Sequence, residues 1–200
     1  MTYNSEEWIF EQHRQTNHKY DDYVPYEFHL KMVKSVADRF FYLIDKQIFF
    51  EWKDNAEELT RYSSYTNDYK KYKYDITEKV ITLACYGHDL IEDTRVSYND
   101  VKNKLGEDVA NIIYALTNEK GKTRSERAND KYYEGIRNTK GAPFVKLCDR
   151  IANVQYSKDT NSSMFDKYKK ENLDFMYSLC IAHGSGLQPM VDHLIKLFKD

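Results

Sequence analysis

The chain contains little glycine, proline or cysteine: seven Gly, three Pro and three Cys among 200 residues. So few chain-breaking residues, together with abundant Lys, Glu, Asp and Tyr, are typical of a helical protein with short connections. Cys85, Cys148 and Cys180 are far apart, odd in number, and each set in an apolar helical pattern. We interpret them as reduced core thiols of a cytosolic protein, in preference to a disulfide framework or a catalytic nucleophile.

Long hydrophobic runs and a large net charge are absent too. No apolar segment approaches about 18 residues, and the N-terminus lacks the apolar stretch of a signal peptide. The 30 basic and 32 acidic residues give a net charge of −2, which argues against a general nucleic-acid or membrane-surface binder. We therefore expect a soluble cytoplasmic protein with no nucleic-acid or membrane partner.

Apolar residues recur at helical spacing through most of the chain, and no internal repeat or linker interrupts it. We predict one all-α domain over residues 1–200, in which residues 157–200 form C-terminal helices that complete the bundle. Helices are predicted over residues 1–17, 26–44, 76–93, 97–105, 109–116, 144–156 and 169–182, and from residue 189 onward. Asp75–Glu78 and Ser97–Asp100 resemble capping boxes, and residues 118–130 form the longest predicted loop.

Residues 46–75 are predicted to be an insertion. Tyrosines recur there at spacings of three and four, at positions 62, 65, 69 and 72, among several lysines. Aromatic rings and ammonium groups suit nucleotide bases and phosphates, so the stripe could be a nucleotide-binding patch. We favour the alternative, in which the tyrosines pack on the domain and the lysines face water.

Four ionisable residues interrupt the predicted helix over residues 76–93. On one continuous helix, with His88 at 0°, Glu92 falls at about 40°, Asp89 at about 100° and Asp93 at about 140°. Apolar residues such as Leu83 fill the opposite side. A merely solvated face would be expected to include Lys or Arg, and none occurs between Lys79 and Arg95. The helix is therefore predicted to present an imidazole and three carboxylates on one face.

An adjacent His88–Asp89 pair suits a divalent metal with mixed nitrogen and oxygen ligands, such as Mn²⁺ or Fe²⁺. His29 and Asp149 would complete a set of two His and two Asp that leaves positions for water and substrate. Alone, each has a simpler explanation: His29 as a packed or capping residue, and Asp149 as a solvated one. A metal in this set would activate water. Glu92 and Asp93 would then orient or deprotonate it.

The same residues carry a family resemblance. His29, His88–Asp89 and Asp149 resemble the H…HD…D signature of the HD-domain metal phosphohydrolases. Within that superfamily, the HDLIEDT stretch at residues 88–94 resembles the HDxxEDT motif of the alarmone (p)ppGpp hydrolases, which include the hydrolase domain of the Rel/SpoT proteins. The P-Y-x-x-H entry at residues 25–29, the L-G-E-D-V and A-L-T segments at 105–117 and the KLCDRIAN helix at 146–153 are similar as well.

This resemblance implies an HD-type helical bundle with a metal site between helices. It also implies a Mn²⁺-dependent hydrolase that removes the 3′-pyrophosphate of ppGpp or pppGpp, a small-molecule nucleotide substrate. His29, His88, Asp89 and Asp149 would hold the metal, and Glu92 and Asp93 would be catalytic. The expected substrate contacts come from three parts of the chain: Lys19, Tyr20, Arg124, Lys146, Asn153 and Tyr156.

The chain departs from the family pattern before its first histidine. The family's Arg-Lys-x-Gly run, whose Arg stacks on guanine, is replaced by His18-Lys19-Tyr20-Asp21-Asp22. Lys19 is expected to supply a phosphate contact there and Tyr20 an aromatic platform. The basic residues of the 118–130 loop, Arg124 among them, either meet an anionic substrate or face water.

Two other readings remain open. A broader HD-domain phosphohydrolase would act on nucleoside monophosphates or another phosphoester, and it would not require the Glu92–Asp93 pair. A non-catalytic, metal-stabilised module would bind a nucleotide or a partner without turnover. Loss of a ligand or of the acidic pair would favour the module, and every one of these residues is present.

Overall fold

The structure is a computed structural model, and it describes residues 5–44, 67–179 and 186–199. Within these ranges the chain forms helices and no β-strand, with one isolated bridge between Lys19 and Pro25. The all-α prediction is confirmed. The helices, in chain order, are α1 (Ser5–Gln15), α2 (Tyr26–Phe40), the 3₁₀ helix η1 (Phe41–Leu43), α5 (Asn67–Gly87), α6 (Leu90–Asp93), α7 (Tyr98–Leu105), α8 (Glu107–Leu116), α9 (Arg124–Arg127), α10 (Asp130–Asn138), α11 (Ala142–Asp159), α12 (Met164–Ser178) and α13 (Gln188–Leu197).

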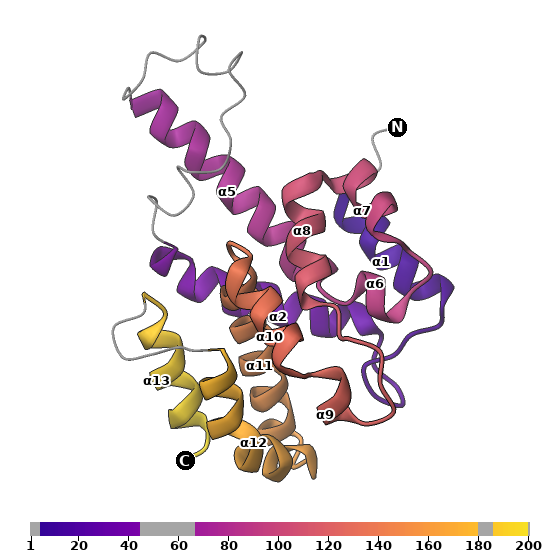
Figure 1. Cartoon of the computed structure of the whole chain (residues 1–200), viewed down its shortest axis with the longest axis vertical. Coiled ribbons are helices and arrows are strands. Elements are labelled where there is room, and N and C mark those ends of the chain that lie inside the picture. The colour runs from indigo at the N-terminus through magenta and orange to yellow at the C-terminus, as the bar shows by residue number, and fades with distance from the viewer. Residues whose placement is uncertain (1–4, 45–66, 180–185, 200) are drawn as a thin grey trace.

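Helix α11 lies at the centre of the bundle and packs most extensively against α2 (Figure 1). Helix α2 in turn packs on α5, and α5 on α8, while α12 and α13 cover the other side of α11. The buried residues of α2 recur every three or four positions, so one face of the helix joins the core. That face includes His29, which is why a polar side chain lies inside the bundle.

Helix α5 begins at Asn67, nine residues before the start predicted at Ile76. The predicted capping box at Asp75–Glu78 was therefore wrong, because those residues lie inside the helix. Residues 67–75 contain no Gly or Pro and several lysines, which favour helix, so nothing in them ends it. The rest of the predicted insertion, residues 46–66, lies outside the described residues, and it includes Tyr62 and Tyr65.

The helix is interrupted at His88 and Asp89, where a continuous helix to Asp93 was predicted. Helix α5 ends at Gly87 and the short α6 starts at Leu90. A Cβ on Gly87 would lie 2.6 Å from the Cδ1 atom of the fully buried Ile113, so the absence of a side chain lets α5 approach α8 closely here. Glu92 and Asp93 consequently lie on a different helix from the last turn of α5.

Other helix ends agree with the sequence to different degrees. The capping box at Ser97 is confirmed by hydrogen bonds in both directions with Asp100, and Gly106, at φ 102°, follows the end of α7. The predicted long loop contains α9, and α12 begins at Met164, five residues before the predicted 169. Helix α10 was not predicted. Asn129 caps it by accepting a hydrogen bond from the Tyr132 backbone.

Cys85 and Cys148 are buried free thiols in the core, and Cys180 lies outside the described residues. Among the helices described, none has the length and apolar character that crossing a membrane demands.

Candidate metal centre and substrate pocket

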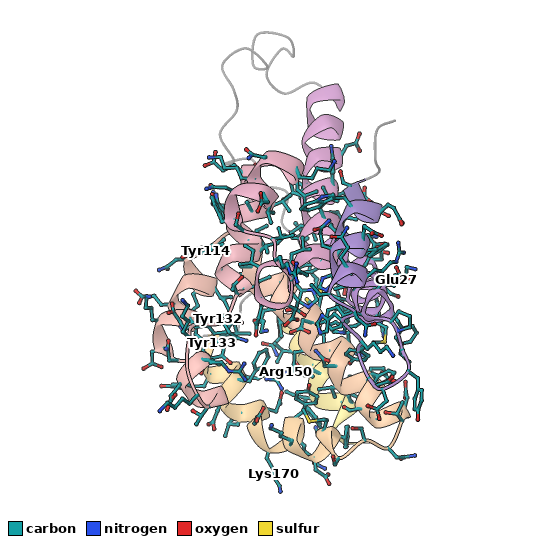
Figure 2. The ribbon with its side chains drawn as sticks, turned by 90° about the vertical axis from the view of Figure 1, so that its right-hand side faces the viewer. Glu27, Tyr114, Tyr132, Tyr133, Arg150 and Lys170 are labelled. Carbon is teal, nitrogen blue, oxygen red and sulfur yellow. The ribbon has the colours of Figure 1, made fainter. Side chains whose placement is uncertain are left out.

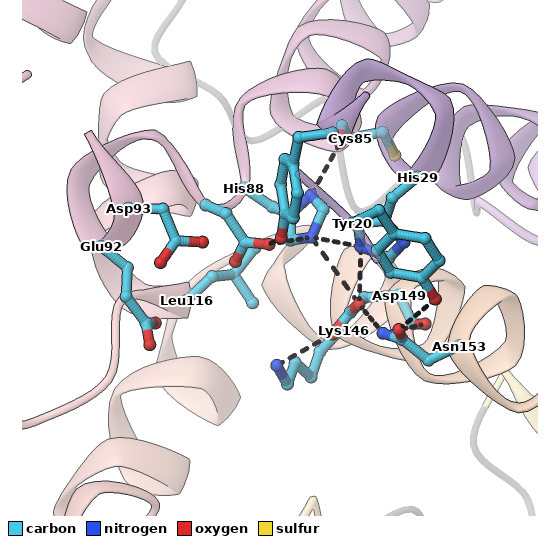
Figure 3. Close-up of polar contacts among 12 residues, drawn as sticks. Tyr20, His29, Cys85, His88, Glu92, Asp93, Leu116, Lys146, Asp149 and Asn153 are labelled. Carbon is cyan, nitrogen blue, oxygen red and sulfur yellow. Dashed lines mark hydrogen bonds and ion pairs between the residues drawn. The ribbon is translucent and has the colours of Figure 1, made fainter. Parts of the chain in front are cut away.

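Three side chains from separate helical segments converge on one point. His29 lies on α2, His88 directly follows α5, and Asp149 lies on α11. One possible ligand atom of each lies within 4.8 Å of the others. The Nε2 atom of His29 lies 3.3 Å from Nε2 of His88 and 3.3 Å from Oδ1 of Asp149. Asp89 lies beside this cluster, with its Oδ2 atom 2.9 Å from Nε2 of His88. Three of the four predicted ligands therefore share one cluster (Figure 3), and the fourth, Asp89, adjoins it beside His88.

The end of helix α5 orients His88. The Nδ1–H of its ring donates to the carbonyl of Cys85 at 2.9 Å, since the carbonyl can only accept. In the neutral ring, Nε2 then carries a lone pair that is directed at the cluster. A ligand histidine whose other nitrogen is held by a backbone carbonyl is a recurring feature of metal sites.

The carboxylates at the centre are also held by neighbours. The Tyr26 hydroxyl donates to Oδ2 of Asp89. The Lys146 ammonium lies 3.1 Å from Oδ2 of Asp149, and the Asn153 amide donates to Oδ1 of the same carboxylate. Each carboxylate thus has a donor from outside the ligand set.

The charges at the centre shift the pKa values of its members. Burial alone would lower the pKa of His88, but the charges of Asp89 and Asp149 and their hydrogen bonds raise it well above the usual range. Burial opposes ionisation of Asp149, yet the Lys146 charge and the two histidines hold its pKa well below the usual range. Without a metal, the centre therefore favours ionised carboxylates and a protonated His88. A bound metal would replace the proton on Nε2 of His88.

The donor set fits a divalent metal. Two imidazole nitrogens and a carboxylate oxygen of Asp149 face one another, and a carboxylate oxygen of Asp89 lies beside His88. The His29 and His88 side chains are almost fully buried. Mixed nitrogen and oxygen ligands suit Mn²⁺, Fe²⁺ or Zn²⁺, whereas a hard cation such as Mg²⁺ prefers oxygen alone. A metal site is therefore supported by geometry as well as by residue type.

Glu92 and Asp93 lie to one side of the cluster, on α6 (Figure 3). Burial, together with the charges of Asp89 and Glu92, raises the pKa of Asp93 to about 7. Glu92 has a different environment. The Asn118 side-chain amide donates to both of its carboxylate oxygens, at 2.8 and 2.9 Å, and the Asn118 backbone N–H lies 3.3 Å from Oε2.

A pocket of about 660 Å³ opens beside Asp149. It lies between the segment after α8 and helices α10, α11 and α12. Its walls carry both cations and aromatic rings, and Tyr132, Tyr133 and Arg150 can be followed in Figure 2. The Arg150 guanidinium carbon lies 4.2 Å from the ring centroid of Phe175 and 4.8 Å from that of Tyr168. A cation is thus fixed in the pocket wall by two rings.

The predicted substrate contacts divide into two groups. Lys146 and Asn153 line the pocket. The hydroxyl of Tyr20 donates to Oδ1 of Asn153 at 2.7 Å, and its ring stacks on His29 with 4.6 Å between centroids. One face of the predicted aromatic platform therefore covers a metal ligand.

Two of the remaining predicted contacts, Lys19 and Tyr156, are not among the residues that line the pocket. Lys19 is exposed in the loop before α2. The Tyr156 hydroxyl donates to the Asp21 carboxylate, and its ring meets Tyr20 edge-on at 4.8 Å. Arg124 is the first residue of α9, and its side chain is not among those described.

Several residues of the site were not among the predicted contacts. Tyr26 lies in the P-Y-x-x-H entry and Arg150 in the helix motif, so both were visible as part of the resemblance. Asn118 directly follows the A-L-T segment and had no assigned role. Only the fold brings Asn118 to Glu92, 26 positions away in the sequence.

Comparison with known proteins identifies relatives of modest sequence identity. No family model matches the chain. The guanosine-3′,5′-bis(diphosphate) 3′-pyrophosphohydrolase MESH1 of Drosophila melanogaster is 29% identical over 80 residues, 40% of this chain and 45% of the relative. The Homo sapiens protein of the same name is 29% identical over 113 residues, 56% of this chain and 62% of the relative.

A bacterial relative and a solved structure extend the comparison. The guanosine-3′,5′-bis(diphosphate) 3′-pyrophosphohydrolase of Aquifex aeolicus is 32% identical over 116 residues, 56% of this chain and 16% of the relative. The matches thus span less than two thirds of these curated relatives. A solved structure described as a metazoan ortholog of SpoT that hydrolyzes ppGpp superposes with a TM-score of 0.59 at 18% identity, over 96% of this chain and 92% of that one. The chain therefore resembles the HD-domain ppGpp hydrolases in sequence and shares the helical fold of the SpoT ortholog.

Proposed function

We propose that the chain is a metal-dependent nucleotide pyrophosphohydrolase that removes the 3′-pyrophosphate of (p)ppGpp or a related alarmone. The products would be GDP or GTP and pyrophosphate. The convergence of His29, His88, Asp89 and Asp149 beside a pocket lined by cations is the observation that carries this proposal. The names of the sequence relatives support the choice of substrate.

The four ligands would hold one divalent metal, and we propose Mn²⁺, with Fe²⁺ as the alternative. When bound, such a metal polarises a phosphoryl oxygen and makes water a stronger nucleophile near neutral pH. The Cys85 carbonyl keeps Nε2 of His88 directed at the metal, and Tyr26 and Lys146 keep the carboxylates of Asp89 and Asp149 in place.

Glu92 and Asp93 would handle the protons of the reaction. A carboxylate oxygen of Glu92 would orient the attacking water and take its proton, and the Asp93 carboxyl would return a proton to the leaving group. Both residues lie on the α6 turn, which begins directly after Asp89. The charge of Asp89 also acts on Asp93, so Asp93 lies close to this proposed metal ligand.

Cations and polar groups around the centre would bind the nucleotide. Lys146 lines the pocket next to Asp149, where its ammonium would neutralise a phosphate. Asn153 and Tyr20 form one hydrogen-bonded pair at the other side, and we propose that this pair contacts the nucleoside. Lys19, Arg124 and Tyr156 are proposed to complete the contacts with the bound nucleotide.

We further propose that residues 1–200 act as one HD-type domain, with residues 46–75 inserted and residues 157–200 completing the bundle, and that the protein works in the cytoplasm. Helices α12 and α13, from the C-terminal part, pack on α11, which supplies Asp149. The C-terminal helices would therefore stabilise the helix on which the metal depends.

Product analysis tests the proposed function. Purified protein would be incubated with Mn²⁺ and, separately, ppGpp, pppApp, NADPH and a set of nucleoside monophosphates. Pyrophosphate release from ppGpp is expected, and it should be lost in Glu92→Gln and Asp93→Asn while the metal content stays unchanged. Glu134→Gln, an exposed residue of α10, is the matched control and should keep full activity. Orthophosphate release from monophosphates alone would refute the proposal in favour of a broader phosphohydrolase.

A further inference from the structure

The Glu92 carboxylate is held by a single residue from another part of the chain. Asn118 directs its side-chain amide at both carboxylate oxygens and its backbone N–H at one of them. These are three contacts to one side chain. We propose that Asn118 is a positioning residue for the reaction, one that fixes the orientation of the catalytic Glu92. This inference rests on the proposed function.

Asn118 is suited to this task by its place in the fold. It follows the C-terminus of α8, where the Thr117 backbone N–H still bonds to the carbonyls of Ile113 and Tyr114. The next residue, Glu119, donates its backbone N–H to the carbonyl of Arg127 at 3.1 Å. The segment is thus fixed on both sides of Asn118, so a group attached to it can hold another group in a set position.

The chemistry of an amide suits the task as well. A carboxamide donates two N–H groups and carries no charge, so it can hold a carboxylate without taking up the proton that the carboxylate must receive. A Lys or Arg in its place would form an ion pair that weakens the carboxylate as a base. Asn118 also lines the substrate pocket, so Glu92 is held at the edge of the space where the nucleotide is proposed to bind.

Helix α6 needs such outside support. It contains only four residues, Leu90–Asp93, and Leu90 is its one fully buried side chain. A helix this short cannot hold a side chain in place by its own packing. Misplacement of a catalytic group by about 1 Å can lower a rate by about 100-fold. The orientation of Glu92 therefore depends on the segment after α8.

Two substitutions at Asn118 separate positioning from binding. Asn118→Asp keeps the shape of the side chain but sets a second carboxylate against Glu92. Asn118→Ala removes the side-chain donors and keeps the backbone N–H. We expect kcat for pyrophosphate release from ppGpp to fall by about 10- to 100-fold in both variants, with KM changed less than about threefold. Metal content and Tm should stay close to those of the wild type.

Asn111 on α8 offers a matched control, since its side chain accepts a hydrogen bond from Tyr98 at an exposed site. Asn111→Ala should leave both constants unchanged. The double variant Glu92→Gln with Asn118→Ala should keep the same residual rate as Glu92→Gln alone, since a positioning residue has no effect once its target is lost. A rise in KM at constant kcat, or an additive loss in the double variant, would overturn the inference. A wild type inactive on ppGpp would refute the proposed function itself, which is a separate outcome.

Discussion

The hydrogen bond from Tyr26 to Asp89 offers a sharp test of the metal centre. In Tyr26→Phe the hydroxyl is lost and the ring remains. That ring is buried and stacks on His18, with 3.7 Å between centroids, and on His13, at 4.8 Å. Because phenylalanine can keep both stacking contacts, the substitution removes only the contacts of the hydroxyl, which are those with Asp89 and with Asp93.

The expected size of the effect follows from the environment of that bond. A donor to a partly buried carboxylate contributes about 1.5–3 kcal/mol. Loss of a residue that holds a metal ligand typically weakens metal binding by about 10- to 100-fold, which corresponds to about 1.4–2.8 kcal/mol. The two figures agree. Tyr26→Phe should therefore raise the Kd for Mn²⁺ by about 10- to 100-fold.

Calorimetric titration of the metal-free protein with Mn²⁺ measures this Kd. Tyr98→Phe is the control, because its hydroxyl donates at 2.8 Å to the exposed Asn111 and has no part in the centre. A Tyr26→Phe protein that binds Mn²⁺ within twofold of the wild type would refute the assignment of Asp89 as a ligand held by Tyr26. Equal weakening by Tyr98→Phe would refute it too, since the effect would not be specific to the centre.

Three further predictions concern the ligand set, the metal and the core. Asp149→Ala should weaken Mn²⁺ binding by more than about 100-fold, as measured by metal analysis after dialysis, while the control Asp159→Ala, at the exposed end of the same helix, should bind normally. Chelation should lower Tm by about 5–10 °C relative to protein with Mn²⁺ at 100 times its Kd, because such binding stabilises the folded state by about 2.7 kcal/mol; an unchanged Tm in a melting assay would contradict a resident metal. Burial lowers the pKa of His13 from 6.5 to about 4. Between pH 6.5 and pH 4, His13 therefore binds a proton in the unfolded chain but not in the folded chain. The free energy of unfolding should therefore fall as pH drops through this window. Urea unfolding should show that it falls by about 2 kcal/mol more in the wild type than in His13→Gln between pH 7.5 and pH 5. An equal fall in the two proteins would count against a neutral buried His13.

The fold and the ligand cluster were largely predictable because each leaves a local trace in the sequence. Helices α2, α8 and α11 show apolar residues at helical spacing, and a helix buried on one face must show that pattern. The metal ligands lie in short motifs, so their types and spacing suggested a shared site before the structure placed them together.

The features that the sequence did not predict depend on contacts between distant segments. Helix α5 ends at Gly87, where it approaches Ile113 on α8 closely, and a periodic pattern carries no record of that approach. Tyr26 reaches Asp89 across 63 positions, and Asn118 reaches Glu92 across 26. Helix α10 is short and mostly polar, although its buried Tyr132 and Ile136, four positions apart, are a signal that could have revealed it.

The bond from His88 to the Cys85 carbonyl has a consequence beyond metal binding. The last carbonyls of a helix lack partners inside it, and here the ring of His88 satisfies one of them, so the residue caps α5 as well as facing the metal. Removal of His88 would thus loosen the end of a 21-residue helix in addition to removing a ligand. A His88 variant is therefore expected to lose stability even without metal, because the end of α5 loses this cap.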